Sequence, residues 1–112
     1  MTIPTTGKGL MLTGWQMKNG VYYYMNGDGK MQTGWLLYNN TWYYLSESGA
    51  MVTGWITLGD KAYYLGGDGG MLTGWQNIDG QIYYLYPDGH KAVNEVIDTF
   101  YLEQDGIWRK PQ

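Results

Sequence analysis

A repeat of twenty residues runs through most of the chain and constrains its fold more than any other feature. Thr-Gly-Trp recurs at one fixed step, with its tryptophans at Trp15, Trp35, Trp55 and Trp75. A tyrosine pair keeps the same step, at Tyr23-Tyr24, Tyr43-Tyr44, Tyr63-Tyr64 and Tyr83-Tyr84. Glycines and methionines recur in phase with both, at positions 9, 29, 49, 69 and 89 and at positions 11, 31, 51 and 71. Columns locked in phase in this way indicate an array of similar units.

Each repeat predicts a β-hairpin. A first strand of about five residues begins at Gly-Trp, and a second carries the Tyr-Tyr pair followed by Met or Leu. Dipeptides suited to tight turns separate the strands, at Asn19-Gly20, Asn39-Asn40, Asp60-Lys61 and Asp79-Gly80. An isolated two-stranded hairpin is barely stable in water, so the units must stack to bury a core. The sequence therefore predicts an all-β solenoid of stacked β-hairpins.

The second strand of each hairpin has two different faces, because neighbouring strand side chains point oppositely. One face carries the first tyrosine of each pair together with Met25, Leu45, Leu65 or Leu85, and we expect it to be the packed interior. The other carries the second tyrosine and the residue before the pair, which is Tyr22, Trp42, Ala62 or Ile82. This more aromatic face is the candidate ligand surface, and the first tyrosines are expected to be structural.

The ends of the chain depart from the repeat. We expect residues 1–8 to be a linker or an artificial start and residues 9–112 to form the repeat module. Four hairpin units run from about 13 to 92, and an atypical closing hairpin follows over about 93–112, where Phe100-Tyr101-Leu102 restores the motif in an altered position. Terminal units of a solenoid are commonly atypical, because one of their sides lacks a neighbour.

Composition excludes several classes of function. Seven bases stand against ten acids, and the bases are scattered singly, which argues against a nucleic-acid groove. No apolar run approaches the length of a membrane span, and we expect none. Without cysteine and with His90 as its one histidine, the chain offers neither a thiol nucleophile nor a histidine-rich metal site. We therefore predict a protein that is not an enzyme and has no metal or cofactor, with His90 exposed in a glycine-rich link.

The repeat resembles the choline-binding, or cell-wall-binding, repeat of Gram-positive surface proteins and phage endolysins. The resemblance rests on four phased copies of Thr-Gly-Trp, a turn, aromatic-Tyr-Tyr-Leu and Asp-Gly-x-Met, and it covers about residues 9–112. Related repeats occur in streptococcal glucan-binding proteins and clostridial toxins. The resemblance implies a superhelix of hairpins with ligands held between successive units, each in a three-sided aromatic cage.

Carried over, each cage takes the Gly-Trp tryptophan and the residue before Tyr-Tyr from one unit, and a tyrosine of the next unit with a methionine near its floor. The alternation above favours the second tyrosine of each pair for this role. The first cage would then consist of Trp15, Tyr22 and Tyr44 with Met51. The second would consist of Trp35, Trp42 and Tyr64 with Met71.

The remaining candidate ligand residues are Trp55, Trp75 and Tyr84. Ala62 and Ile82 stand where the cage needs an aromatic ring, and Lys91 replaces the expected methionine. Two complete cages are therefore expected if the ligand is choline, with Trp55 and Trp75 in incomplete ones.

The resemblance implies a non-catalytic module that attaches a larger exported or phage-encoded protein to the cell surface, outside the cell, by binding choline of teichoic acids. A carbohydrate-binding module that uses the same rings to stack on glucan or a cell-surface glycan is the first alternative. A structural or self-associating repeat, with a homodimer through the terminal hairpin at Phe100, Tyr101 and Trp108, is the second.

Overall fold

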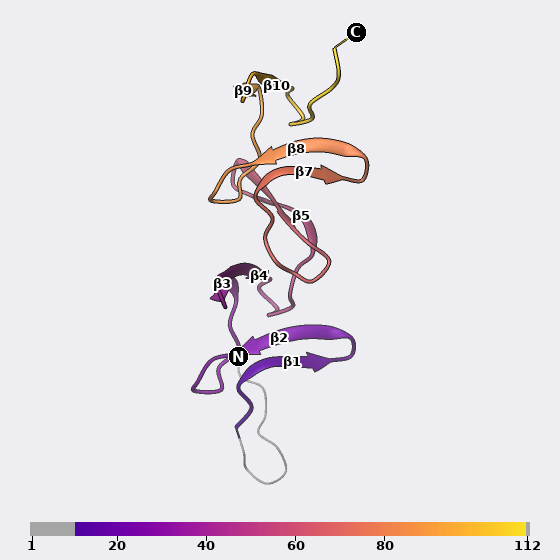
Figure 1. Ribbon diagram of the computed structural model, residues 1–112. Coiled ribbons are helices and arrows are strands. Elements are labelled where there is room, and N and C mark those ends of the chain that lie inside the picture. The colour runs from indigo at the N-terminus through magenta and orange to yellow at the C-terminus, as the bar shows by residue number, and fades with distance from the viewer. Residues whose placement is uncertain (1–10, 112) are drawn as a thin grey trace. The chain divides into compact units, whose positions relative to one another are not determined.

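The computed structural model describes residues 11–111, and over that range it consists of ten β-strands and no helix. Successive strands pair into five antiparallel hairpins (Figure 1). These are β1 (Gly14–Lys18) with β2 (Val21–Met25), β3 (Gly34–Tyr38) with β4 (Thr41–Leu45), β5 (Gly54–Leu58) with β6 (Lys61–Leu65), β7 (Gly74–Ile78) with β8 (Gln81–Leu85), and β9 (Glu95–Ile97) with β10 (Phe100–Leu102). The predicted all-β array of hairpins is confirmed.

The chain divides between Thr53 and Gly54 into two compact units. The first contains β1–β4 and the second contains β5–β10. The predicted linker over 1–8 lies outside the described residues, and the extent of the repeat module stays a prediction.

The hairpin turns are two residues long and use left-handed backbone conformations. Asn19 and Gly20 have φ of 54° and 80°, as a type I′ turn requires. The third turn differs from the prediction, because it lies at Gly59 and Asp60 rather than at Asp60-Lys61. Of these two residues only Gly59 has a positive φ, and glycine at the first central position is typical of a type II′ turn. Lys61 is thereby free to pair with Leu58 in the ladder.

The glycine-rich links between hairpins share one backbone pattern. In the first link, the N–H of Asn26 donates to the carbonyl of Lys30 at 2.9 Å, and the N–H of Gln32 donates to that of Tyr24 at 2.8 Å. The link thus folds back and places the next residue, Met31, opposite the end of β2. Later links repeat these bonds at 46–52, 66–72 and 86–92.

Each hairpin contributes one large side chain that is fully buried. Met25, Leu45, Leu65 and Leu85 are fully buried, and Leu102 continues the series in the closing hairpin. These are the aliphatic residues that follow the tyrosine pairs, so the predicted interior face is confirmed. Each hairpin contributes so little core that its stability depends on its neighbours.

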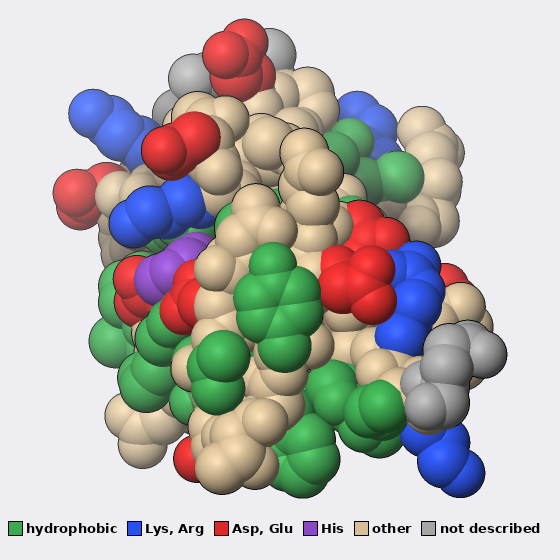
Figure 2. Space-filling model, turned by 90° about the horizontal axis from the view of Figure 1, so that it is seen from above, with side chains coloured by type: hydrophobic (Ala, Val, Ile, Leu, Met, Phe, Trp, Pro, Cys, Tyr) green, Lys and Arg blue, Asp and Glu red, His purple; other side chains and the backbone are tan. Residues whose placement is uncertain are grey.

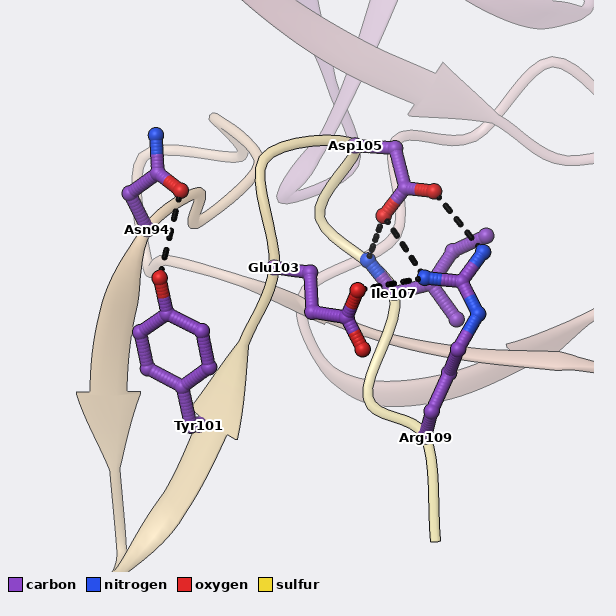
Figure 3. A network of polar contacts seen from close by, with 6 residues as sticks. All are labelled: Asn94, Tyr101, Glu103, Asp105, Ile107 and Arg109. Atoms are coloured by element: carbon purple, nitrogen blue, oxygen red, sulfur yellow. Dashed lines mark hydrogen bonds and ion pairs between the residues drawn. The ribbon is translucent and has the colours of Figure 1, made fainter. Parts of the chain in front are cut away.

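The closing hairpin and the link that follows it carry a network of polar side-chain contacts (Figure 3). Arg109 bonds the carboxylates of Glu103 and Asp105 at 3.0 and 2.9 Å, and Tyr101 donates to Asn94 at 3.3 Å. The Arg109 guanidinium, followed by the N–H of Ile107, holds the pKa of the Asp105 carboxyl below its usual value. Side-chain bonds here supplement a hairpin whose strands have only three residues each.

In the described part of the chain, no helix has the length and apolarity needed to cross a bilayer.

Candidate ligand sites at the hairpin junctions

Each Gly-Trp tryptophan lies directly opposite the second tyrosine of its own hairpin. The register pairs Trp15 with Tyr24, and their ring centroids are 5.2 Å apart. The later hairpins repeat this contact at 5.1, 4.9 and 5.2 Å, in the pairs Trp35–Tyr44, Trp55–Tyr64 and Trp75–Tyr84. The second tyrosine therefore acts as a cross-strand partner that supports the tryptophan ring from within one hairpin.

The ring that approaches from the following hairpin belongs to the first tyrosine of its pair. Tyr43 lies 5.1 Å from Trp15, and Tyr83 lies 4.9 Å from Trp55. In the closing hairpin Phe100 takes this position, 5.8 Å from Trp75.

The structure thus brings Tyr43 beside Trp15, where the sequence led us to expect Tyr44, and Tyr83 rather than Tyr84 beside Trp55. Which tyrosine contacts a ligand stays a prediction. The aromatic faces of two successive hairpins do not meet at the junction. Instead the aromatic face of one hairpin receives the opposite face of the next, on which Tyr43, Tyr38 and the buried Leu45 lie. Alternation separates the two faces correctly, but it does not determine which of them meets the preceding hairpin.

A main-chain hydrogen bond fixes a fourth residue at each junction. The N–H of Met51 donates to the carbonyl of Tyr22 at 2.9 Å. The equivalent bonds in the second unit are those from Lys91 to Ala62, at 2.8 Å, and from Trp108 to Ile82, at 2.9 Å. The residue after each link is thereby fixed beside the residue that precedes the tyrosine pair.

Three junctions are thus defined within the two units, each by four residues. The Trp15 junction comprises Trp15, Tyr22, Tyr43 and Met51. The Trp55 junction comprises Trp55, Ala62, Tyr83 and Lys91. The Trp75 junction comprises Trp75, Ile82, Phe100 and Trp108.

The Trp15 junction has three aromatic walls. Tyr22 lies 6.3 Å from Trp15 at an interplanar angle of 88°, and Tyr43 lies at 68° to the same indole. The Trp15 side chain is half-buried, whereas that of Tyr22 is 42% exposed, so the junction opens to solvent at Tyr22. Both tyrosine rings thus stand edge-on or steeply inclined to the Trp15 indole, and the Met51 backbone is bonded beside Tyr22.

The Trp75 junction also has three aromatic walls, although an incomplete cage was expected there because Ile82 has no ring. Trp75, Phe100, Trp108 and Ile82 line an apolar hollow of about 320 Å³. Phe100 lies edge-on to both indoles, 5.8 Å from Trp75 and 5.6 Å from Trp108. Trp108 occupies the position that methionine takes elsewhere, so it supplies the ring that Ile82 lacks.

Phe100 and Trp108, which line this hollow, were not among the candidate ligand residues predicted from the sequence. The signal was present, because Leu102 corresponds to the buried Leu85 and the residues around it can be aligned in register with the repeat. That alignment assigns Phe100 to the first-tyrosine position and Trp108 to the methionine position. Asp98 was also missed. Its carboxylate accepts a bond from the Trp75 indole at 3.2 Å and so orients the ring.

The Trp55 junction differs from the other two. Ala62 provides no ring, and the Lys91 ammonium lies 5.2 Å from the centroid of the Trp55 ring and 5.8 Å from that of Tyr83. Both distances are within the range of a cation–π contact. Burial, followed by the Asp105 carboxylate, raises the pKa of the Tyr83 phenol, so this ring is neutral at physiological pH.

The second predicted cage is described here only through its residues in the first unit. Trp35 and Trp42 lie 6.3 Å apart at 88°, in the same geometry as Trp15 and Tyr22. Tyr64 and Met71 belong to the second unit, so their part in this cage stays a prediction.

Many of these rings remain open to solvent. Tyr22, Trp42 and Phe100 are exposed by more than 40%, and hydrophobic side chains reach the surface on the face that Figure 2 draws. Exposed aromatic rings on a small domain commonly mark a binding surface.

His90 is less exposed than predicted. Its ring stacks on Tyr86 with centroids 4.4 Å apart, and Nδ1 lies 2.6 Å from an Asp88 oxygen. The His90 N–H also donates to Asp88 and is the main cause of a lowered pKa at that carboxyl. Among residues 11–111 no group of three or more acidic or histidine side chains is arranged to hold a metal ion.

Hairpins stacked so that aromatic rings line their junctions define a repeat-built binding module. The profile of the choline-binding repeat matches the chain twice, over residues 12–53 and 52–96. The chain belongs to the choline-binding repeat family, and the resemblance drawn from the sequence is confirmed. Membership makes it a non-catalytic binding module of the kind that cell-wall-binding proteins carry. No protein among curated sequences matches it.

Solved structures of choline-binding proteins resemble the chain over nearly its whole length. Choline binding protein F of Streptococcus pneumoniae is 44% identical with a TM-score of 0.88, over 93% of this chain and 36% of that one. CbpJ of the same species is 43% identical with a TM-score of 0.88, over 92% and 36%. The Cpl-1 endolysin, in complex with a peptidoglycan analogue, is 34% identical with a TM-score of 0.60, over 88% and 31%. The chain therefore spans about a third of the length of these relatives.

Proposed function

We propose that this chain is a cell-wall attachment module that binds the choline of bacterial teichoic acids. The observation that carries the proposal is the pair of three-walled aromatic junctions at Trp15 and Trp75. The module would act outside the cell, as part of a larger exported or phage-encoded protein.

The chemistry of choline suits these junctions. A quaternary ammonium is positive, presents methyl groups, and cannot donate a hydrogen bond through its nitrogen. Aromatic faces attract the charge through their quadrupole and shelter the methyl groups, at about 0.5–2 kcal/mol for each ring. Three walls then supply roughly 2–5 kcal/mol, which corresponds to dissociation constants in the millimolar range.

The apolar character of the Trp75 junction argues against the glycan alternative. Its four lining residues offer two side-chain hydrogen-bonding groups, the indole N–H groups of Trp75 and Trp108, and that of Trp75 already bonds to Asp98 at 3.2 Å. A sugar has several hydroxyl groups, most of which would lose their bonds to water there without replacement. A methylated cation has no such groups at its head.

A titration with choline chloride tests the proposal, following tryptophan fluorescence and near-ultraviolet circular dichroism, with equimolar sodium chloride as the control. We expect a saturable change in the millimolar range and a rise in thermal stability, since a ligand that binds only the folded state stabilises it. A response to neutral glucan oligosaccharides with none to choline would favour the glycan alternative instead.

Self-association is a separate outcome of the same titration. Phe100 and Tyr101 are 45% and 51% exposed in the closing hairpin, which leaves them open to a second copy. Light scattering with and without choline would reveal a homodimer, and a monomer at every choline concentration would remove that alternative.

A further inference from the structure

Lys91 is the one departure from the repeat that introduces a charge into an aromatic junction of the two units. In the Trp15 and Trp75 junctions the residues at its position are Met51 and Trp108, and in the other repeats they are Met31 and Met71. Its backbone is held in the same way as those of Met51 and Trp108, by the bond from its N–H to the Ala62 carbonyl. The difference therefore lies in the side chain alone.

The stem of Lys91 replaces methionine in packing. A Cβ on Gly106 would lie 2.7 Å from Cδ of Lys91, just as a Cβ on Gly89 would lie 2.2 Å from Sδ of Met71. Both glycines have positive φ, 86° and 94°. The methylene chain thus rests on a glycine in the following link, as the methionine thioether does one repeat earlier.

The ammonium group of Lys91 extends beyond that packing position to the rings. It lies over Trp55 at 5.2 Å and over Tyr83 at 5.8 Å, and it donates a hydrogen bond of 2.9 Å to the carbonyl of Asp105. These are the two rings whose counterparts, Trp15 with Tyr43, form walls of the first junction. Ala62 is small where Tyr22 stands in that junction, and this leaves the third side without a wall.

We propose that Lys91 is a built-in occupant of the Trp55 junction, which holds its own cation and does not take up an external quaternary ammonium ion. That the junction would otherwise bind choline rests on the proposed function. The position of the Lys91 ammonium over the two rings does not depend on any ligand. An external cation would have to displace the Lys91 ammonium, which contacts two rings and a carbonyl. If the ammonium stayed in place, its positive charge would repel the external cation.

The built-in cation also ties the fourth hairpin to the closing one. Lys91 reaches from the link after β8 to Asp105 in the link after β10, a separation of fourteen residues. At this junction the contact between Lys91 and Asp105 thus takes the place of a bound ligand.

The first test needs no ligand. In a proton NMR spectrum, the ε-methylene protons of Lys91 should be shifted upfield by the ring currents of Trp55 and Tyr83. Those of Lys61, an exposed lysine on β6, should have ordinary shifts. Ordinary shifts at both lysines would overturn the occupancy, whatever the protein binds.

The second test follows the indole N–H resonances of Trp15, Trp55 and Trp75 during a choline titration. In the wild-type protein we expect choline to change the indole N–H chemical shifts of Trp15 and Trp75 and to leave that of Trp55 unchanged. In Lys91→Met, Trp55 should begin to respond. In Lys91→Met with Ala62→Tyr, it should saturate in the same concentration range as Trp15, with one more choline bound per chain.

Two control variants separate the site from general charge effects. Lys91→Arg keeps a cation over the rings and should leave Trp55 silent, and Lys61→Met removes a charge elsewhere and should change nothing. A choline response of Trp55 in the wild-type protein would overturn the inference, and so would a silent Trp55 in the double variant while Trp15 responds. If Trp15 and Trp75 were silent in every variant, the proposed function would fail, and the ring-current test alone would decide on Lys91.

Discussion

Individual residues at each junction carry roles that their neighbours in sequence do not share. Tyr43 and Tyr44 are adjacent, yet Tyr43 faces the indole of the preceding hairpin and Tyr44 supports the indole of its own. The same division separates Phe100, which lines the Trp75 junction, from Tyr101, which bonds to Asn94. Ligand binding and hairpin stability should therefore respond to different members of each pair.

Tyr43→Leu should weaken choline binding at the Trp15 junction by about 2- to 30-fold, because it removes one cation–π wall worth about 0.5–2 kcal/mol. Tyr101→Leu, on the opposite face of β10 from Phe100, should leave that binding unchanged. The measurement is the shift of the Trp15 indole resonance with choline concentration. Equal effects of the two substitutions would contradict the assignment of Tyr43.

Glycine is required at the link position that receives the methionine side chain. Gly49 has φ of 89°, and a Cβ there would lie 2.3 Å from Sδ of Met31. Gly49→Ala should lower the free energy of unfolding by about 2 kcal/mol or more, since the left-handed backbone alone costs about 1–2 kcal/mol and Met31 must also move. Gly27→Ala meets nothing within 4 Å and should change it by less than about 0.5 kcal/mol. Denaturant unfolding of both variants checks this, and similar losses would contradict the packing argument.

At this scale the sequence predicted the kinds of residue in the site better than their partners. The tryptophans and Tyr22 lie at the junctions as expected, because a phased repeat places equivalent residues equivalently. The structure places Tyr43 and not Tyr44 beside the preceding indole, because strand alternation does not determine which face of the next hairpin packs there. Trp108 was missed because three residues are lost from the repeat before it, and this hides its alignment with Met51.

At the scale of single elements, the hairpin turns show how local chemistry sets the register. Four of the five turns have two residues with positive φ, and Asn, Asp and Gly fill almost all of these places. The exception is Thr99, at φ of 72° in the turn between β9 and β10. A β-branched residue is a genuine outlier in this region. The closing hairpin thus combines short strands with an unfavourable turn.

Thr99→Gly should raise the free energy of unfolding by about 0.5–1 kcal/mol, because it relieves the left-handed conformation at the cost of some chain entropy. Thr99→Ala removes the branch but keeps Cβ, so its gain should be smaller. Thermal unfolding of the two variants distinguishes them. A loss of stability in Thr99→Gly would mean that the turn is not strained as its backbone indicates.

Most elements could be predicted from sequence because turn dipeptides and strand patterns agree with one another. The third turn could not, since Gly59-Asp60 and Asp60-Lys61 are both plausible by composition. Pairing across the ladder decided between them, with Lys61 opposite Leu58. Short closing strands such as β9 carry too few residues for a periodic signal.

At the scale of the whole molecule, the account predicts several weak sites rather than one strong one. The Trp15 and Trp75 junctions lie in different units of the chain, and each should bind free choline in the millimolar range. A polymer that carries many cholines can engage them together, and effective concentration then raises the overall affinity.

The chain should therefore bind a surface densely grafted with choline at least about a hundredfold more tightly than a sparse one. Removing the Trp75 junction with Trp108→Ala should abolish most of that gain while the Trp15 junction still binds free choline. Surface plasmon resonance at two grafting densities measures the difference, with free choline chloride as the eluting competitor. Equal affinity at both densities would contradict binding through separate sites.

We propose that quaternary ammonium ions bind between the rings of successive hairpins. Intermolecular nuclear Overhauser effects from the N-methyl protons of choline would locate the bound cation. We expect contacts to the rings of Trp15 and Tyr43 and to those of Trp75, Phe100 and Trp108, with none to Trp55. Saturable choline binding that gives no contact to the Trp15 and Trp75 junctions would contradict it.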